Sequence, residues 1–577
     1  MNKKYTLLII SIGLILVGFI PMFTITHFNV NYNRYDLTLS SKTDGIILSA
    51  WLYVPNPAPT DSDPVPGVVV CHGFASSKIS IHQYSSEIAK RGIVVIAFDF
   101  RGHGNSEGYL DALRFTNRSP LIGDCLAAIN HLQGLNYVDN KSIALVGHSM
   151  GAFTSMQTSA MYYNYINTTI AIGSILQGHF ESEDYINTSR ISNLMLGIGK
   201  RDELFSVSAA LNFLANITDG IGTQSDTLYG NFSYGNATKL VISPYSDHEM
   251  EIYDTLLTEN IIIWLENAFF GGLRYPVSLS TPMQIIFMII SFMGISMGFF
   301  PVISLTRDFV FKKESIIEDK KEQVKRLGIK LATTKSEKVK SILYYSLCYS
   351  GGMGIGLLLQ VPIDILFESA IPKVFSDILL GMIGGMIIGL IIAYILIHKV
   401  IEKDNTPITR SILHRVSKDF RRLVLLSVVF FLYVLITIGL FIHYSLFDMI
   451  PTLKEFGVIL IALPIILLFF LLDELIIRRL QDKLNFQSTL KEVGIITIIG
   501  SLLKMVFFIP IFFLAHGLIL MVIEPLAIII PLMQGISAWM YTNSRRNCIV
   551  SSLVSALMVT WILIMMMPFG CMSFPIF

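Results

Sequence analysis

One serine lies in a pattern that can turn a hydroxyl group into a nucleophile. Ser149 is flanked by Gly147 and Gly151, directly after an apolar run that ends at Val146. This pattern is typical of a sharp turn between a strand and a helix, where a side chain at either glycine would collide with the backbone that crosses there. The turn exposes the hydroxyl and aims the next backbone N–H groups at a bound carbonyl oxygen. The pattern therefore predicts a nucleophile elbow at Ser149.

The segments around Ser149 are those that an elbow needs. Two strand-like pieces, residues 35–39 and 45–54, come first, and apolar runs then alternate with helical stretches. Continuous apolar runs separated by helices indicate a parallel sheet covered on both faces. Residues 25–268 are therefore predicted to form one doubly wound, mostly parallel α/β domain. The apolar runs are residues 65–71, 93–98, 143–146, 168–175, 193–198 and 239–242, and the helical stretches are 79–90, 121–132, a helix from 149, and 249–268.

The rest of the chain has the composition of a membrane protein. The 577 residues are 53% hydrophobic and only 15% charged, and they are too many for one compact domain. Residues 1–24 hold a charge-free apolar run behind two lysines and no small-x-small cleavage site, which favours an uncleaved signal anchor over a signal peptide. Residues 269–282 form a linker. Residues 283–577 are predicted to be an all-α transmembrane domain, with about nine spans including the anchor.

Charge predicts the orientation of these spans. Lys3 and Lys4 precede the first span, and the loop of residues 306–340 is rich in Lys and Arg. Because basic loops stay in the cytoplasm, residues 25–282 are expected on the extracytoplasmic side of a multi-pass protein, in the cell membrane. Asn-x-Ser/Thr sequons occur only in the α/β domain, which gives mild support to an extracytoplasmic location of that domain. The net charge of +1 and the absence of a basic face argue against a nucleic-acid partner.

Several motifs of residues 36–270 resemble the α/β-hydrolase superfamily. The Asp-x-Arg-Gly-x-Gly-x-Ser block is similar to that of serine aminopeptidase-like, X-prolyl peptidase-like and monoacylglycerol-lipase-like members. The motifs also occur in the superfamily's order, with the nucleophile first, the acid second and the histidine last. They are Val70-Cys71-His72-Gly73-Phe74, Asp99-Phe100-Arg101-Gly102-His103-Gly104-Asn105-Ser106, Gly147-His148-Ser149-Met150-Gly151, Gly197-Ile198-Gly199-Lys200-Arg201-Asp202 and Ser246-Asp247-His248.

This resemblance implies a role for each site residue. Ser149 would be the nucleophile, His248 the general base and later acid, and Asp202 the carboxylate that orients His248. Glu203, next to Asp202, is an open alternative for the acid. The backbone N–H groups of Phe74 and Met150 would form the oxyanion hole.

The residues around these groups are expected to support them, and no cofactor is expected. His72, His103, Asp99 and Arg101 are expected to hold loops, and His148 to pack. No Cys/His cluster has metal-ligand spacing, so neither a metal nor an organic cofactor is expected.

The membrane half resembles a second family more weakly. Asp473-Glu474 followed by Arg478 looks like the Glu-Glu-x-x-x-Arg motif of the CAAX-protease and bacteriocin-processing (CPBP) intramembrane proteases, and His516 resembles a residue of that family's second motif. The family's closing His-x-x-x-Asn is replaced by Ser555 and Val559, so a non-catalytic relative is expected. The alternative is a simple i,i+4 ion pair between Glu474 and Arg478. Lys504 and Glu524 are expected to pair within the spans.

The leading interpretation is a membrane-bound serine hydrolase that cleaves an ester or peptide-type acyl bond. Its partners would be a small ester, lipid or peptide substrate and the lipid bilayer. The short segment between residue 176 and Asp202 leaves little room for a lid and indicates an open site. Two alternatives remain: a non-catalytic α/β-hydrolase-like sensor or transport protein, and a CPBP-type intramembrane protease with an accessory hydrolase domain.

Overall fold

The chain divides into two compact units, each described here by itself. The sheet unit comprises Leu16–Ser291, Phe441–Ile450 and Met565–Phe577, and the helical unit comprises Met1–Ile15, Phe292–Leu440 and Pro451–Ile564. The structure is a computed structural model. It describes the chain except residues 1–2, 112–119, 177–187, 312–328, 361, 364–370, 374–375, 410–411, 413–418, 445–447, 487, 515–517 and 572–577.

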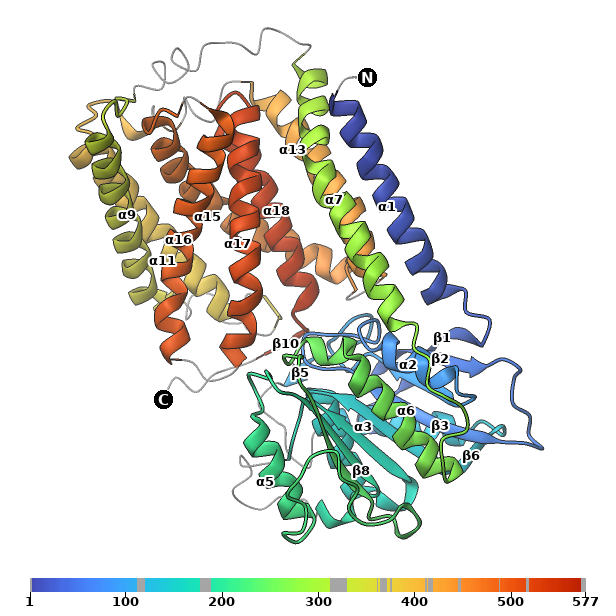
Figure 1. Cartoon of the computed structure of the whole chain (residues 1–577). Helices are drawn as coiled ribbons and strands as arrows, with labels where there is room; N and C mark the ends of the chain where they lie inside the picture. Colours follow the sequence, from blue (N-terminus) through green and yellow to red (C-terminus); the bar gives the residue numbers. More distant parts are fainter. Residues whose placement is uncertain are drawn as a thin grey trace. The chain divides into compact units, whose positions relative to one another are not determined.

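An eight-stranded sheet forms the centre of the sheet unit (Figure 1), in the order β1-β2-β4-β3-β6-β7-β8-β9. The first two strands form an antiparallel hairpin, β2 is antiparallel to β4, and all later neighbours are parallel. The predicted mostly parallel sheet is therefore confirmed. The strands are β1 (Tyr32–Ser40), β2 (Ile47–Pro55), β3 (Val65–Cys71), β4 (Val94–Phe98), β6 (Val138–His148), β7 (Thr168–Ile172), β8 (Leu194–Gly199) and β9 (Thr238–Ser243).

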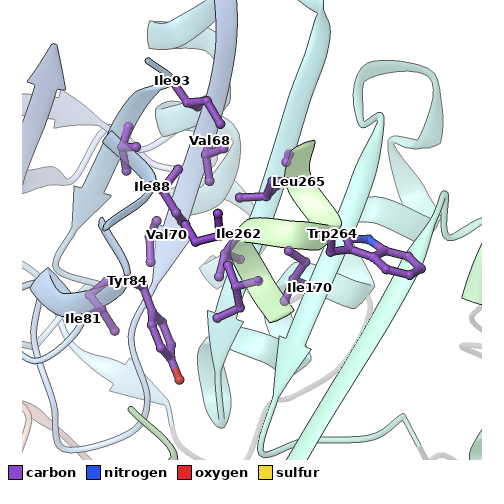
Figure 2. Close-up of a cluster of buried hydrophobic side chains, with 14 of the residues drawn as sticks. Val68, Val70, Ile81, Tyr84, Ile88, Ile93, Ile170, Ile262, Trp264 and Leu265 are labelled. Carbon is purple, nitrogen blue, oxygen red and sulfur yellow. The ribbon is translucent and has the colours of Figure 1, made fainter. Parts of the chain in front are cut away.

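Helices cover both faces of this sheet because its central strands are apolar on both sides. On one face, α2 (His82–Ala89) and α6 (Thr255–Phe270) pack on β3 and β7; Figure 2 shows Ile88, Ile262 and Leu265 meeting Val68, Val70 and Ile170. On the other face, α4 (Met150–Met161) and α5 (Val207–Ile217) pack on β7 and β8, while α3 (Pro120–Gln133) packs on β3 and β6. Each buried Ile, Leu or Val contributes roughly 1.5–3 kcal/mol to the stability of this frame.

The carboxyl end of the chain adds a short strand to the sheet unit. β10 (Gly570–Cys571) pairs in parallel with β5 (Leu110–Asp111), and Leu110 N donates to Phe569 O at 2.7 Å. The sequence predicts a span over residues 549–572, whereas α18 (Cys548–Met566) ends six residues earlier. Pro568 lies just beyond this end and disfavours helical backbone in the residue before it.

Long apolar helices make up the helical unit. Among the described residues, six helical stretches of the whole chain are long and apolar enough to cross a membrane. These suggest a membrane domain, while the predicted total of about nine stays a prediction. The six are α1 (Lys3–His27), α7 (Thr281–Val310), Leu379–Ile401, which includes most of α11 (Ser376–Leu396), Phe420–His443, which includes α13 (Phe420–Val434), α15 (Leu453–Lys483) and α18. The further long helices are α9 (Lys335–Leu358), α16 (Thr489–Leu514) and α17 (Leu518–Asn543).

Small residues allow two of these helices to pack closely. Gly352 and Gly356 of α9 lie against Gly389 and Gly385 of α11, and a Cβ on any of the four would overlap backbone atoms of the facing helix or press against them. Close backbone approach through small residues is typical of helices that associate within a membrane.

Candidate active site

Ser149 lies on the predicted turn between β6 and α4. Its backbone has φ +51° and ψ −117°, a conformation that is costly for a residue with a side chain and is often found at functional sites. A Cβ on Gly147 would overlap the Gly151 carbonyl oxygen, and a Cβ on Gly151 would overlap that of Cys71. Both glycines are thus required by sterics, as the sequence pattern predicts.

Two loops at the carboxyl edge of the sheet bring His248 and Asp202 to this serine. His248 Nε2 lies 2.9 Å from Ser149 Oγ, and His248 Nδ1 lies 2.9 Å from Asp202 Oδ2. The imidazole is 1% exposed, whereas Ser149 is partly exposed. Residues separated by about 50 to 100 positions in sequence therefore form one hydrogen-bonded chain that ends on a reachable hydroxyl.

The carboxylate that meets the imidazole is Asp202 rather than Glu203. Asp202 Oδ1 also accepts hydrogen bonds from Leu204 N at 2.7 Å and Phe205 N at 2.8 Å. Burial opposes the ionisation of Asp202, but hydrogen bonds and charge attraction from His248, with these two backbone N–H groups, lower its pKa. Glu203 Oε2 accepts instead from the backbone N–H of His248 at 3.1 Å. Through this contact Glu203 holds the backbone of the histidine loop.

The loop after β3 passes beside Ser149. A Cβ on Gly73 would lie 3.3 Å from the Ser149 Cβ, so the backbone of Gly73 and Phe74 runs along the serine. Met150 is the first residue of α4, and its N–H group belongs to the positive end of that helix. The predicted role of the Phe74 and Met150 N–H groups as an oxyanion hole stays a prediction.

Buried polar contacts hold the loop after β3 and the loop after β4. His72 Nδ1 donates to Gly73 O at 2.7 Å, and its Nε2 accepts from Phe100 N at 2.9 Å. This arrangement requires a neutral ring, in agreement with burial lowering the pKa of His72 to about 4. Asp99 accepts from Lys78 N at 2.7 Å and from Asn105 N at 3.0 Å, which ties the loop after β3 to the loop after β4.

An ion pair network secures the second of these loops. Arg101 donates to Asp124 Oδ1 at 2.7 Å and to Asp44 Oδ2 at 2.6 Å, and His103 Nδ1 lies 3.0 Å from Arg101 O. Arg101 thereby connects the loop to α3 and to the turn between β1 and β2. These residues hold their loops, which is the role that the sequence predicts for them.

Glu251 is a buried carboxyl group that sequence reasoning missed. Its Oε2 lies 3.4 Å from His148 Nε2 and 4.0 Å from His248 Nδ1, and its Oε1 accepts from Gly199 N at 2.5 Å. Burial and the nearby Asp202 charge raise the pKa of Glu251 well above its usual range. Its position three residues after His248 is the one signal in the sequence, because that spacing returns a side chain to the same side of a helical turn.

His148, His248 and Glu251 also form the one group of described residues with ligand atoms close enough for a metal ion. Hydrogen bonds account for most of this arrangement, since His248 Nδ1 faces Asp202 and His148 Nε2 faces the His248 carbonyl oxygen at 3.0 Å.

Two ion pairs join polar residues of the membrane half, Glu474 with Arg478 and Asp473 with Lys504. Arg478 donates to both carboxylate oxygens of Glu474, at 2.7 and 3.0 Å, and Ser537 donates to Glu474 at 2.6 Å. Lys504 pairs with Asp473 at 2.8 Å, while the side chain of Glu524, its expected partner, lies outside the described residues. His516 also lies outside them, as do residues 177–187, where the short lid segment is predicted. The CPBP resemblance stays a prediction.

Comparison with known proteins identifies the fold of the sheet unit. A family model described as "Serine aminopeptidase, S33" matches residues 62–206. A monoacylglycerol lipase of Mycolicibacterium smegmatis is 29% identical over 121 residues, which are 21% of this chain and 41% of the lipase. These matches support the α/β-hydrolase superfamily for the sheet unit. The predicted superfamily and fold are therefore confirmed, and this part of the chain is of the hydrolase type.

Two further comparisons show how much of each chain the similarity covers. An uncharacterised protein of Mycobacterium tuberculosis is 32% identical over 109 residues, which are 19% of this chain and 35% of that protein. The solved esterase Est1E of Butyrivibrio proteoclasticus with bound ferulic acid is 19% identical, covers 41% of this chain and 100% of its own, and has a TM-score of 0.31. The chain thus spans less than half the length of the two curated relatives named here.

Proposed function

We propose that the chain is a membrane-bound serine hydrolase that cleaves an ester or a peptide-type acyl bond through an acyl-enzyme. The hydrogen-bonded chain from Asp202 through His248 to Ser149 carries this proposal. A strained elbow, two buried partners and a partly exposed hydroxyl are the parts that nucleophilic acyl transfer requires.

In the proposed reaction, Ser149 Oγ attacks the substrate carbonyl carbon while His248 Nε2 takes the hydroxyl proton. The charge that develops on the carbonyl oxygen would be stabilised by the N–H groups of Phe74 and Met150; losing one such donor typically costs about 2.7–4 kcal/mol. His248 then returns the proton to the departing alcohol or amine. A water molecule, deprotonated by His248, releases the acyl group and restores Ser149.

The proposed substrate is a small ester, a lipid or a peptide, and the proposed reaction uses no metal or organic cofactor. The match to a monoacylglycerol lipase supports an acyl ester among these classes. The raised pKa of the buried Glu251 fits the proposal, because a carboxyl group that resists ionisation competes less with Asp202 for the positive charge of the imidazolium.

The proposed location is a membrane crossed several times, with the hydrolase domain on the extracytoplasmic side and residues 1–24 as an uncleaved anchor. The apolar helices support a membrane domain, and the basic loop at residues 306–340 supports this orientation. The lipid bilayer is then a partner of the protein.

Labelling with a fluorophosphonate probe tests both parts of the proposal. Intact cells that express the full chain should be labelled by a membrane-impermeant probe, and Ser149→Ala and His248→Ala should abolish labelling. Ser62→Ala, at an exposed serine in the loop between β2 and β3, should label like the wild type. Labelling that persists in Ser149→Ala would refute the nucleophile. Labelling only after the cells are lysed would refute the orientation.

A further inference from the structure

A cavity of about 240 Å³, with polar and apolar walls, lies in the sheet unit. Its walls come from β1 and β2, from the start of α2, from the end of α1, from the start of α7 and from His443, Tyr444 and Asp448. None of the residues that line it is Ser149, His248 or Asp202. We call it the β1–α7 cavity.

The carboxylates of this cavity are already paired with groups of its own wall. Asp36 accepts from Trp51 Nε1 at 2.7 Å. Asp448 accepts from Asn105 Nδ2 at 2.7 Å and lies 3.1 Å from His443 Nδ1. Lys78, a cationic residue of the wall, is paired with Asp99 and also donates to Ser49 Oγ at 3.0 Å. These groups therefore do not call for a ligand.

Three other atoms of the wall are buried and have no hydrogen-bond partner among the residues that the structure describes: Arg34 Nη1, His82 Nε2 and Gln284 Oε1. His82 and Gln284 are each only 4% exposed, and all three residues line the cavity. The Arg34 guanidinium lies over the Trp51 ring, 4.1 Å from its centroid. Buried polar atoms without a partner are rare, and each typically costs about 1–3 kcal/mol.

The protonation of His82 follows from its neighbours. Burial lowers the pKa of His82 well below its usual range, so its ring is neutral and carries one proton. Tyr53 Oη lies 2.8 Å from His82 Nδ1, and burial raises the pKa of Tyr53, so this hydroxyl keeps its proton. We assign the hydroxyl as the donor to Nδ1 in this contact. The ring proton is then on Nε2. Arg34 and His82 thus offer two donors, and Gln284 offers one acceptor.

We propose that the β1–α7 cavity binds an organic phosphate that carries a neighbouring hydroxyl group, such as a phosphoglycerol group. An anionic oxygen satisfies Arg34 Nη1 and His82 Nε2 together, and the hydroxyl donates to Gln284 Oε1. Guanidinium groups bind phosphate well because their donors are fixed in one plane. This proposal rests on the cavity alone and does not depend on the proposed reaction at Ser149.

The apolar part of the wall indicates where such a ligand comes from. Met22 belongs to α1, and Ile285 and Met288 belong to α7, two of the helices long enough to cross a membrane. Apolar side chains at the ends of such helices suit the first carbons of acyl chains. The same phosphoglycerol chemistry also exists in free glycerol phosphates, so the experiment must separate the two sources.

Binding to the full-length protein in detergent tests the proposal by isothermal titration calorimetry. The probes are dihexanoylphosphatidylglycerol below its micelle concentration, glycerol 3-phosphate, inorganic phosphate and dihexanoylphosphatidylcholine. We expect saturable binding of the phosphatidylglycerol, weakened about tenfold or more by Arg34→Gln and by Gln284→Met, since each change removes one charged or buried hydrogen bond. Arg190→Gln is the matched control, because Arg190 also lies over an aromatic ring, that of Tyr163, outside the cavity.

Each outcome has a defined meaning. Tighter binding of the phosphatidylglycerol than of glycerol 3-phosphate supports a lipid ligand, and equal binding supports a free organic phosphate; both uphold the site. Inorganic phosphate or the phosphatidylcholine binding as tightly as either would overturn the requirement for a hydroxyl group. The site itself is refuted if the wild type binds none of the probes, or if Arg34→Gln and Gln284→Met bind like the wild type. Thermal unfolding, which does not depend on the reaction at Ser149, checks that the variants are folded.

Discussion

At the scale of single residues, the candidate site depends on which of two adjacent carboxylates touches the imidazole. Asp202 Oδ2 lies 2.9 Å from His248 Nδ1, whereas Glu203 accepts a hydrogen bond from the backbone N–H of His248. The sequence leaves both acids open because they are neighbours in one loop. The hydrogen bonds from Leu204 and Phe205 to Asp202, which turn its carboxylate towards the ring, exist only in the folded loop.

This difference predicts unequal effects of two matched substitutions. Asp202→Asn should lower kcat by about 10⁴-fold, because an amide at this position favours the wrong tautomer of the histidine. Glu203→Gln should change kcat less than tenfold, since its amide oxygen can still accept the backbone hydrogen bond. Hydrolysis of a chromogenic ester measures both. The assignment is wrong if Glu203→Gln is the more damaging change.

A second prediction at this scale concerns acid stability. The pKa of His72 is about 4 in the folded protein, below the usual value of about 6.5, so between these pH values the unfolded chain binds a proton that the folded chain does not. The stabilisation is complete above pH ~6.5 and is lost as the pH falls towards ~4, by up to about 3 kcal/mol for this residue. Thermal unfolding of the detergent-solubilised chain at pH 7.5 and 5.0 measures this loss. His72→Gln should reduce the difference between the two pH values, and an unchanged difference would contradict the assignment.

At the scale of elements, the nucleophile turn is an example of local sequence determining local structure. The crossing of β6, α4 and β3 leaves no room for a Cβ on Gly147 or Gly151. The spacing of the glycines around Ser149 therefore predicts the turn from the sequence alone. The fold of the domain can also be predicted from a local pattern. Apolar runs separated by helices have few ways to pack other than a covered parallel sheet.

Gly151→Ala should therefore disrupt the turn, while Gly272→Ala should not. A Cβ at Gly151 meets the backbone of Cys71, and overpacking of this kind typically costs about 1–3 kcal/mol. A Cβ at Gly272 has no other atom within 4 Å. Fluorophosphonate labelling together with thermal unfolding measures both variants. Normal labelling of Gly151→Ala would mean that the turn can relax.

At the scale of the whole molecule, the question is whether the polar residues of the helical unit carry a second activity. Glu474 is 1% exposed and is held by both Arg478 and Ser537, so its carboxylate is occupied. Asp473 is likewise occupied by Lys504 and by Tyr349, which donates at 2.8 Å. These contacts favour ion pairs that stabilise the helices over a water-activating site.

Glu474→Ala should therefore destabilise the protein by about 3–5 kcal/mol, because it leaves the buried Arg478 without its carboxylate. Esterase activity per folded molecule should not change, and Glu259→Ala, at an exposed position of α6, should affect neither property. Thermal unfolding and ester hydrolysis of the same samples measure the two effects. An activity that survives Ser149→Ala but is lost in Glu474→Ala would instead favour an intramembrane protease.

The sequence by itself determined the features that depend on local spacing: the turn at Ser149, the mostly parallel sheet and the apolar helices. Only the tertiary structure distinguished Asp202 from Glu203, revealed Glu251 behind the imidazole, and collected Arg34, His82 and Gln284 around one cavity. The physical reason is that these groups come from elements far apart in the chain. Their contacts depend on strand order and loop path, which no local pattern of residues encodes.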